Sequence, residues 1–221
     1  MSTNPAHTPS REQMVTQQVR AWDVLDDGIL ELFRRLPREH FVPPAYRDAA
    51  YADVPLPLAD GQHMLVPSVA GRLLQALDVQ PGERVLEIGT GSGFLSACFA
   101  LQGAKVTTLE IHSRLAEQAR ANLAAAGIPG VDVRHADVFS MLAGPDRFDA
   151  VAVTGSLPEY DERFESLLNP EGRLFVVVGA GHAMEARRIT LGAAGERQEE
   201  SLFETGLDAL DHARRPAGFI F

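Results

Sequence analysis

Three glycines at alternate positions, Gly89, Gly91 and Gly93, stand between two apolar runs in the stretch VLEIGTGSGFLS. Apolar residues that meet glycines and then continue in a helix-compatible run are typical of a strand that turns tightly into a helix. Because glycine has no side chain, such a turn lets a ligand come very close to the backbone. The stretch therefore predicts a binding loop, although a turn without a ligand can also contain several glycines.

Acidic residues at the ends of strand-like runs indicate what this loop holds. Glu110 ends the run KVTTLE, where a carboxylate can accept hydrogen bonds from both hydroxyls of a ribose. Asp137 ends the next strand-like run, where it can recognise the edge of an adenine while Val138 packs on the ring. Glu87, two residues before Gly89, can orient the loop or a nearby cation. The three acids together predict an adenosine ligand.

The glycine spacing separates two adenosine cofactors. It reads G-x-G-x-G and lacks the final spacing of the dinucleotide pattern G-x-G-x-x-G, because Phe94 occupies the position of the last glycine. An NAD-dependent dehydrogenase therefore fits poorly, and we expect S-adenosyl-L-methionine. A non-catalytic module that binds this cofactor is an alternative.

The composition limits the classes of protein to which the chain can belong. Its 221 residues, 45% of them hydrophobic, suffice for one α/β domain. The formal net charge of −10 argues against non-specific binding to nucleic acid. The sequence has no apolar run long enough to span a membrane and no signal-peptide core at its N-terminus, so we expect a cytoplasmic protein. The single cysteine, Cys98, lies in an apolar run and fits a reducing compartment, and we assign no metal site.

The order of the predicted elements places the glycine loop inside an α/β fold. From residue 84 on, strand-like runs alternate with helix-like runs, one of which predicts a helix over 160–168. This alternation predicts a Rossmann-like, mostly parallel sheet of about seven strands with helices on both faces. Its last strands are expected over 185–192, 201–207 and 217–221.

An N-terminal helical extension is expected before the sheet. Ser10 and Gln13 have the spacing of a capping box, which predicts that a helix starts there. Asp26 or Asp27 is expected to cap a second helix, and Pro67 suits the first turn of a third. The predicted elements are helices over 10–21, 26–36 and 67–77 and an ordered, irregular segment over 38–66.

Taken together, the motifs resemble protein-L-isoaspartate O-methyltransferases, a family of class I S-adenosylmethionine-dependent methyltransferases. The runs REHFVP, AYADVPLPL, LEIGTGSGF, FDAVAVTGSLP and EGRLFVVVG follow the order of that family over roughly residues 10–180. The resemblance implies methylation of the free α-carboxylate of L-isoaspartyl residues, so that isoaspartyl proteins or peptides are the expected partners. The ester then collapses to a succinimide, which repairs aged proteins. The resemblance places the cofactor against Glu87, Ile88, Gly89, Thr90, Gly91, Ser92, Gly93, Glu110, Ile111, Asp137 and Val138.

The loop before the third predicted helix departs from the family's pattern, G-Q-T-I-S-Q-P. It reads GQHMLVP over 61–67, so His63 replaces the threonine and Leu65 replaces the serine that the resemblance places at the active site. An isoaspartyl carboxylate is already ionised at neutral pH and needs no general base, so we expect slow methylation rather than none. His63, Thr154 or Ser156 are candidates to orient the acceptor in place of the serine.

The altered loop also leaves a second interpretation, a methyltransferase whose pocket at Leu65 selects a different acceptor, either a small molecule or a modified peptide. In both cases residues 1–80 form the helical extension and the acceptor-site loop, and residues 81–221 form the cofactor-binding core of one compact domain.

Overall fold

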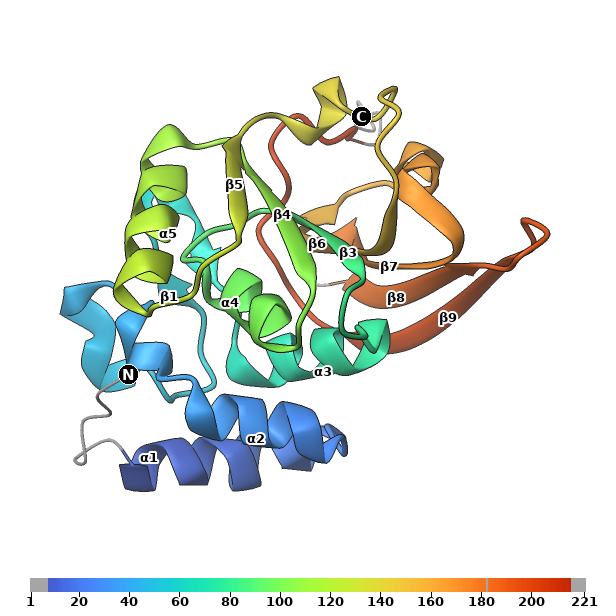
Figure 1. Ribbon diagram of the computed structural model, residues 1–221. Coiled ribbons are helices and arrows are strands. Elements are labelled where there is room, and N and C mark those ends of the chain that lie inside the picture. The colour runs from blue at the N-terminus through green and yellow to red at the C-terminus, as the bar shows by residue number, and fades with distance from the viewer. Residues whose placement is uncertain (1–7, 182, 216–221) are drawn as a thin grey trace, which may run out of the picture.

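A seven-stranded sheet forms the centre of the computed structural model, which describes residues 8–181 and 183–215 (Figure 1). Its strands are β3 (Arg84–Ile88), β4 (Lys105–Glu110), β5 (Asp132–His135), β6 (Phe148–Leu157), β7 (Leu168–Ala180), β8 (Ala183–Leu191) and β9 (Arg197–Glu204). Their order across the sheet is β5-β4-β3-β6-β7-β8-β9. The strands from β5 to β7 pair in parallel, and β8 and β9 add antiparallel pairs. The predicted mostly parallel sheet is confirmed.

The strand order reverses its direction at β3, which lies between β4 and β6. The chain moves outward through β4 and β5 on one side of β3 and through β6 and β7 on the other. The connections that leave the ends of β3 and β6 therefore diverge and open a crevice at the carboxyl edge of the sheet, where open α/β sheets bind their ligands. The glycine loop follows β3 directly and so lies at this crevice.

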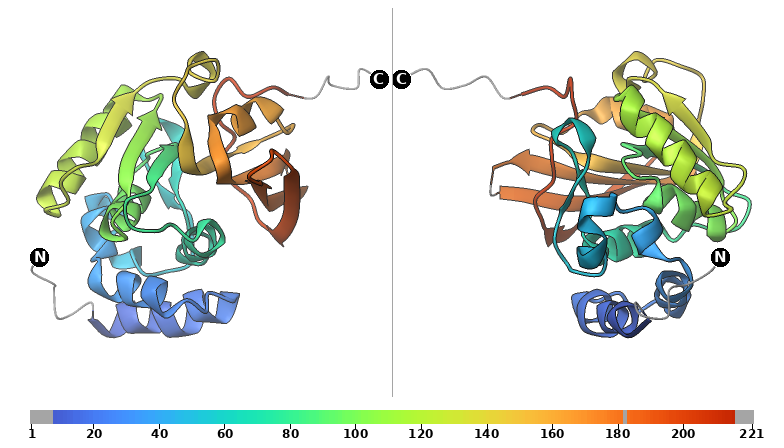
Figure 2. Two further views of the ribbon diagram at one scale, coloured as in Figure 1. Left: turned by 45° about the vertical axis from the view of Figure 1, so that its right-hand side comes forward. Right: turned by 90° about the vertical axis from the view of Figure 1, so that its left-hand side faces the viewer.

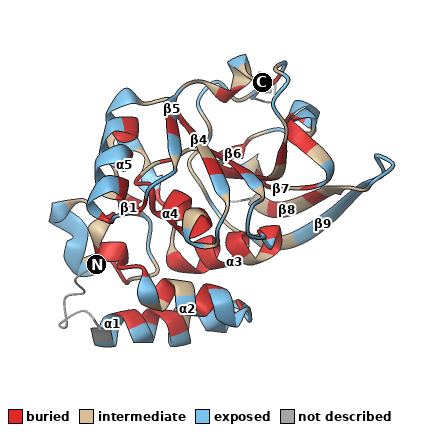
Figure 3. Ribbon diagram, in the orientation of Figure 1, coloured by how far each residue is buried: buried red, intermediate tan, exposed pale blue. Residues whose placement is uncertain are grey.

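Helices cover the two faces of the sheet unequally. Helices α3 (Pro67–Leu77), α4 (Phe94–Leu101) and α5 (Ser113–Ala125) pack on one face, and α3 and α4 consist mostly of buried residues (Figure 3). The other face is covered by two short 3₁₀ helices, Val138–Ser140 and Glu162–Leu167. The thiol of Cys98 on α4 is free and buried.

The α-helix predicted over 160–168 is therefore wrong in type. A 3₁₀ helix forms instead, from Glu162 to Leu167, because the chain must enter β7 at Leu168. The buried residues Phe164 and Leu167 are three positions apart, which matches the three residues per turn of a 3₁₀ helix. Asp161 caps this helix by accepting a hydrogen bond from the backbone N–H of Arg163.

The N-terminal helices lie beneath the rest of the molecule, as the two blue helices at the bottom of both views in Figure 2 show. Helix α1 (Thr8–Gln13) continues in π and 3₁₀ turns to Trp22, so Ser10 lies inside the helix and the predicted capping box is wrong. Helix α2 (Asp27–Arg35) begins as predicted, with the Asp26 carboxylate accepting a hydrogen bond from the Ile29 N–H at 3.0 Å. Both helices share one hydrophobic core with α3, α4 and the sheet.

The irregular segment over 38–66 is ordered, as predicted, and a buried arginine holds it. The short strands β1 (Leu56–Pro57) and β2 (His63–Met64) pair within it to form a hairpin. Arg38 Nε donates to the Ala50 carbonyl at 3.0 Å, and Arg38 Nη2 donates to the Leu65 carbonyl at 2.5 Å. The guanidinium also lies 4.8 Å from the centre of the Phe94 ring, so it fixes the hairpin against the start of α4. Burial lowers the pKa of Arg38 to about 10, which leaves it charged at neutral pH.

The tail after β9 crosses the carboxyl edge of the sheet. The Ser156 N–H donates to the Asp208 carbonyl at 2.8 Å, and the Leu210 N–H donates to the Ser156 carbonyl at 2.9 Å, so the tail runs beside the end of β6. The strands expected over 185–192 and 201–207 correspond to β8 and β9, and the one expected over 217–221 lies outside the described residues.

Within 8–181 and 183–215, no helix is long and apolar enough to cross a membrane. In the same ranges, no group of three or more His, Cys, Asp or Glu side chains is suited to hold a metal ion.

Candidate active site

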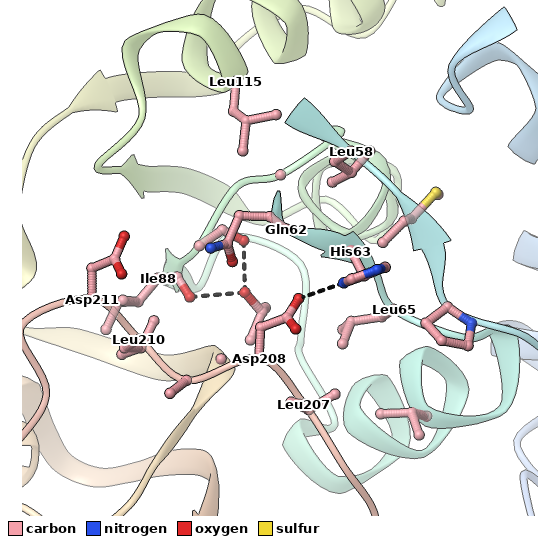
Figure 4. A pocket seen from close by; sticks show the side chains of 18 of the residues that line it. Leu58, Gln62, His63, Leu65, Ile88, Leu115, Leu207, Asp208, Leu210 and Asp211 are labelled. Atoms are coloured by element: carbon pink, nitrogen blue, oxygen red, sulfur yellow. Dashed lines mark hydrogen bonds and ion pairs between the residues drawn. The ribbon is translucent and has the colours of Figure 1, made fainter. Parts of the chain in front are cut away.

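A cavity of about 600 Å³ lies at the carboxyl edge of the sheet (Figure 4). The ends of β3, β4, β5 and β6 form its floor. The β1–β2 hairpin and the tail over 205–211 form its walls. This is the place that the strand order predicts, and its size suits a nucleoside ligand together with part of a second substrate.

The glycine loop follows the cavity floor with its backbone exposed to a ligand. Gly89 has φ = 97°, and a Cβ atom added there would lie 2.3 Å from the Thr154 hydroxyl. That hydroxyl interacts with the carbonyls of Ile88 at 2.9 Å and Gly89 at 2.6 Å, which ties the loop to β6. A Cβ atom added to Gly91 would lie 3.2 Å from a methyl group of Leu58 in the hairpin. All three glycines have a positive φ, and at Gly89 and Gly91 a side chain would also come too close to a neighbouring residue.

Glu110 stands at the end of β4, beside the glycine loop, and is only 4% exposed. Its Oε2 accepts a hydrogen bond from the Gly91 N–H at 2.8 Å, and its Oε1 accepts one from the His112 N–H at 3.1 Å. These donors fix the carboxylate, and each oxygen keeps a second lone pair for another donor. The side chain is therefore held in place to bind two hydroxyl groups of one ligand.

Asp137 lies on the neighbouring strand end and connects the site to the tail. Its Oδ1 accepts a hydrogen bond from the Phe139 N–H at 2.9 Å, and its Oδ2 lies 2.8 Å from Nδ1 of His212. The hydrogen bond and the negative charge of Asp137 raise the pKa of His212 above its usual value. Val138 also lines the cavity.

Glu87 does not reach the main cavity. It is buried beneath the glycine loop and accepts a hydrogen bond from the hydroxyl of Ser96 on α4. Burial raises the pKa of Glu87 to about 8. The carboxyl group lines a second cavity of about 50 Å³ between the loop and the hairpin, together with Thr90, Ser92 and Arg38. Glu87 therefore supports the loop from below.

The side of the main cavity opposite Glu110 is built from the hairpin and the tail. Leu65 and His63 both line it, and His63 Nδ1 lies 3.0 Å from Oδ2 of Asp208 in the tail (Figure 4). Thr154 lines it as well, but its hydroxyl is engaged with the glycine loop. Ser156 is fully buried, with its hydroxyl 3.3 Å from the Leu207 carbonyl, and does not line the cavity.

The structure thus brings most of the predicted site residues to one cavity. Those that line it are His63, Leu65, Ile88, Gly89, Gly91, Glu110, Ile111, Asp137, Val138 and Thr154. Three others line the small cavity beneath the loop, namely Glu87, Thr90 and Ser92. Gly93 and Ser156 line neither cavity.

Several residues of the site were not predicted. Asp208 contacts His63, and Asp211 Oδ2 lies 3.0 Å from His112 Nε2. Trp22 reaches the cavity from the N-terminal helices. The tail sequence LDALDH, with two acids and a histidine, indicates a candidate functional segment. Its spacing does not predict which distant residues the tail contacts.

Comparisons with known proteins agree with this geometry. Residues 9–205 match the family model for protein-L-isoaspartate(D-aspartate) O-methyltransferase. The chain is 40% identical over 175 residues to protein-L-isoaspartate O-methyltransferase 1 of Rhodopseudomonas palustris strain HaA2, covering 79% of this chain and 71% of that one. It is 37% identical over 206 residues to the protein-L-isoaspartate O-methyltransferase of Methanoregula boonei, covering 92% and 93% of the two chains.

Solved structures show the same fold. One is a Plasmodium falciparum protein assigned as a protein-L-isoaspartate O-methyltransferase, in complex with S-adenosyl-L-homocysteine. It matches with a TM-score of 0.77 at 20% identity, over 91% of this chain and 98% of that one. A second structure, a protein-L-isoaspartate O-methyltransferase, matches with a TM-score of 0.73 at 22% identity, over 90% of this chain and 65% of that one.

Proposed function

The chain belongs to the protein-L-isoaspartate(D-aspartate) O-methyltransferase family, and we propose how its cavity performs the reaction of that family. It is an S-adenosylmethionine-dependent O-methyltransferase. We assign its substrate as the free carboxylate of an L-isoaspartyl residue in a protein or peptide. The cofactor occupies the end of the cavity at β3, β4 and β5, and the acceptor occupies the end between the hairpin and the tail.

The residues present fit the cofactor. A buried carboxylate that two backbone N–H groups already hold, Glu110, matches the two hydroxyls of a ribose. The glycine loop leaves no room for a side chain at Gly89, so a ligand there meets backbone groups. Asp137 and Val138 stand where a polar edge and an apolar face of an adenine would lie. When bound, S-adenosylmethionine supplies an electrophilic methyl group on a sulfonium.

The acceptor carboxylate needs orientation and a dry environment more than it needs a base. It is ionised at neutral pH, so the protein has no proton to remove. The tail and the hairpin form two walls of the cavity and partly shield a bound acceptor from water, which strengthens electrostatic interactions there. In this proposal the walls hold one carboxylate oxygen in line with the methyl group.

Gln62 and His63 are polar side chains of the acceptor loop that line the cavity, and His63 is the one that contacts the tail. Its Nδ1 faces Asp208, so the neutral imidazole that donates to Asp208 leaves Nε2 without a proton. The imidazolium form donates from both nitrogens and is the form that can bind a second carboxylate. Leu65, in contrast, offers no donor, which supports a reaction slower than one with a serine at this position.

One observation carries the proposal: the glycine loop, Glu110 and the acceptor loop line the same cavity. The test is methyl transfer from labelled S-adenosylmethionine to an isoaspartyl peptide beside its normal aspartyl twin. We expect slow incorporation into the first and none into the second. No incorporation into either peptide, in a sample that binds the cofactor, would contradict the proposal.

Leu65 favours one alternative acceptor. Its side chain lines the cavity where a polar group would bind a carboxylate, so the pocket also suits a less polar acceptor, either a small molecule or a modified peptide. This alternative predicts cofactor binding without turnover of isoaspartyl peptide. The same assay therefore separates the two.

A further inference from the structure

The single tryptophan of the chain, Trp22, stands at the cavity although it belongs to the N-terminal helical segment. Its side chain lines the cavity and is 42% exposed. Its indole packs edge-on against Phe203 of β9, with 6.1 Å between ring centres. Tryptophan is strongly enriched among residues that dominate binding, because it buries a large area at a small entropic cost.

The position of Trp22 is fixed from below by Arg72 of α3. Arg72 Nη1 donates to the Trp22 carbonyl at 3.1 Å, and Nη2 donates to the Leu202 carbonyl at 3.3 Å. The guanidinium lies 4.9 Å from the centre of the Phe203 ring. Arg72 therefore holds the backbone of Trp22 and the Phe203 ring on which the indole packs, and such preorganisation favours binding.

The wall around Trp22 differs in chemistry from the cofactor end of the cavity. Glu110 and Asp137 line the cofactor end. The wall at the other end contains the apolar residues Trp22, Pro55, Val66, Val69, Met184 and Leu207, together with the polar residues Asp53, Ser68 and Thr205. An apolar wall continuous with the acceptor loop suits a side chain of the polypeptide that carries the isoaspartyl residue.

The strand spacing of the sheet gives an approximate distance between Trp22 and the end of β6. Neighbouring strands lie about 4.8 Å apart, and β9 is three strands beyond β6, so Phe203 lies roughly 14 Å across the sheet from Thr154. An indole that reaches inward from Phe203 shortens this path. The ring centres of Trp22 and Phe203 are 6.1 Å apart, which leaves about 8 Å of this path. An extended chain rises about 3.3 Å per residue, so the remaining path corresponds to about two or three residues.

We propose that Trp22 is a specificity-determining residue, whose indole receives an apolar side chain two or three residues from the isoaspartyl residue. The inference rests on the proposed function, because it takes an isoaspartyl polypeptide as the substrate. It adds a preference that the cofactor-binding residues and the acceptor loop do not provide.

The kinetic test uses the full chain and a panel of isoaspartyl peptides. Each peptide carries leucine or glycine at one of the three positions on either side of the isoaspartyl residue. We expect kcat/KM to be about tenfold higher for leucine than for glycine at one or two of these positions. Trp22→Ala abolishes this ratio, whereas Trp22→Phe keeps most of it. Leu25→Ala, which removes an apolar side chain 68% exposed in the same region, is the matched control and leaves the ratio unchanged.

Fluorescence gives a second readout that a loss of folding cannot imitate. Trp22 is the only tryptophan, so its emission reports directly on its environment. Titrating the wild-type protein, saturated with S-adenosylhomocysteine, with the preferred leucine peptide is expected to shift the emission to shorter wavelength. The all-glycine peptide should shift it far less.

Two results would overturn the inference alone. One is the same leucine-to-glycine ratio in wild type and Trp22→Ala, and the other is unchanged emission at a saturating concentration of the leucine peptide. A failure of the proposed function looks different, because then no peptide of the panel is methylated, including the all-glycine peptide, and the inference falls with it.

Discussion

The two ends of the cavity are built in different ways. At the cofactor end, the carboxylate of Glu110 binds the N–H of Gly91, 19 residues away, and that of His112, two residues away. At the acceptor end, His63 meets Asp208 across 145 residues of sequence. The first end is made by consecutive elements of the chain from β3 to β5, and the second exists only after the tail has crossed the sheet.

This difference indicates which end can change without loss of the fold. The cofactor end uses backbone N–H groups and carboxylates at strand ends, whose positions follow from the sheet itself. The acceptor end is a hairpin and a tail that Arg38, His63 and Ser156 tie to the rest of the molecule. A substitution such as leucine for serine there alters the lining of the pocket and leaves the sheet unaffected.

The largest expected effect is at the glycine loop. Gly89→Ala places a methyl group 2.3 Å from the Thr154 hydroxyl and forces a side chain into φ = 97°. We expect a loss of cofactor affinity of about a hundredfold or more and a loss of stability of about 3 kcal/mol, since strain and clash act together. Calorimetry with S-adenosylhomocysteine and chemical denaturation measure the two effects.

Gly82→Ala is the matched control for this loop. Gly82 has φ = 90°, but a Cβ atom there meets nothing within 4 Å. The control therefore carries only the backbone strain, about 1–2 kcal/mol, and keeps its cofactor affinity. Equal affinities for Gly89→Ala and Gly82→Ala would show that the loop tolerates a side chain and does not contact the cofactor.

The next largest effect is expected on cofactor affinity when Glu110 is replaced. Glu110→Ala should weaken binding of S-adenosylmethionine and S-adenosylhomocysteine by about ten- to a hundredfold, because two ribose hydroxyls lose a charged acceptor. Glu117→Ala, which removes an exposed carboxylate on α5, is the control and leaves affinity unchanged. Calorimetric affinities that do not differ between Glu110→Ala and wild type would remove Glu110 from the cofactor site.

At the acceptor end, the informative substitution is one that is expected to raise the rate of methyl transfer. Leu65→Ser should raise the single-turnover rate on isoaspartyl peptide by up to about one or two decades, through one hydrogen bond to a charged group. Cofactor affinity should stay the same. Leu65 also packs against the hydrophobic core, so a stability cost of about 2 kcal/mol is expected, and rates must be measured well below both melting points.

Leu101→Ser controls for the loss of a leucine, because Leu101 is largely exposed on α4 and does not line the cavity. It should change neither the rate nor the affinity. A rate for Leu65→Ser at or below that of wild type would favour a pocket shaped for another acceptor.

The smallest expected effect is on the pKa of His212, whose contact with Asp137 holds the tail at the cofactor end of the cavity. The pKa of His212 is raised by its hydrogen bond to Asp137, so the folded protein binds this proton more tightly than the unfolded chain does. The stabilisation is fully present below the usual histidine pKa, about 6.5, and is lost as the pH rises through the folded value. NMR titration of the imidazole should give a pKa above 6.5 in wild type, and Asp137→Asn should bring it back toward 6.5. An unchanged value in Asp137→Asn would mean that this pair does not hold the tail.

The sequence by itself determined the cofactor end of the site. Alternating strand and helix periods predicted the sheet, and the glycines at 89 and 91 marked the strand-to-helix turn. Glu110 and Asp137 could be placed because residues that end parallel strands meet at one edge of a sheet. In each case the deciding interaction joins neighbouring elements, so local spacing contains the information.

Only the tertiary structure decided the acceptor end. Thr154 and Ser156 are equivalent in the sequence, as polar residues near the end of one strand, yet Thr154 faces the cavity and Ser156 lies beneath the tail. The contacts of Asp208 with His63 and of Trp22 with Phe203 join segments that no periodicity relates. The segment over 160–168 became a 3₁₀ helix because β7 begins at Leu168. Long-range packing sets such outcomes, since it selects among conformations that the local sequence allows equally.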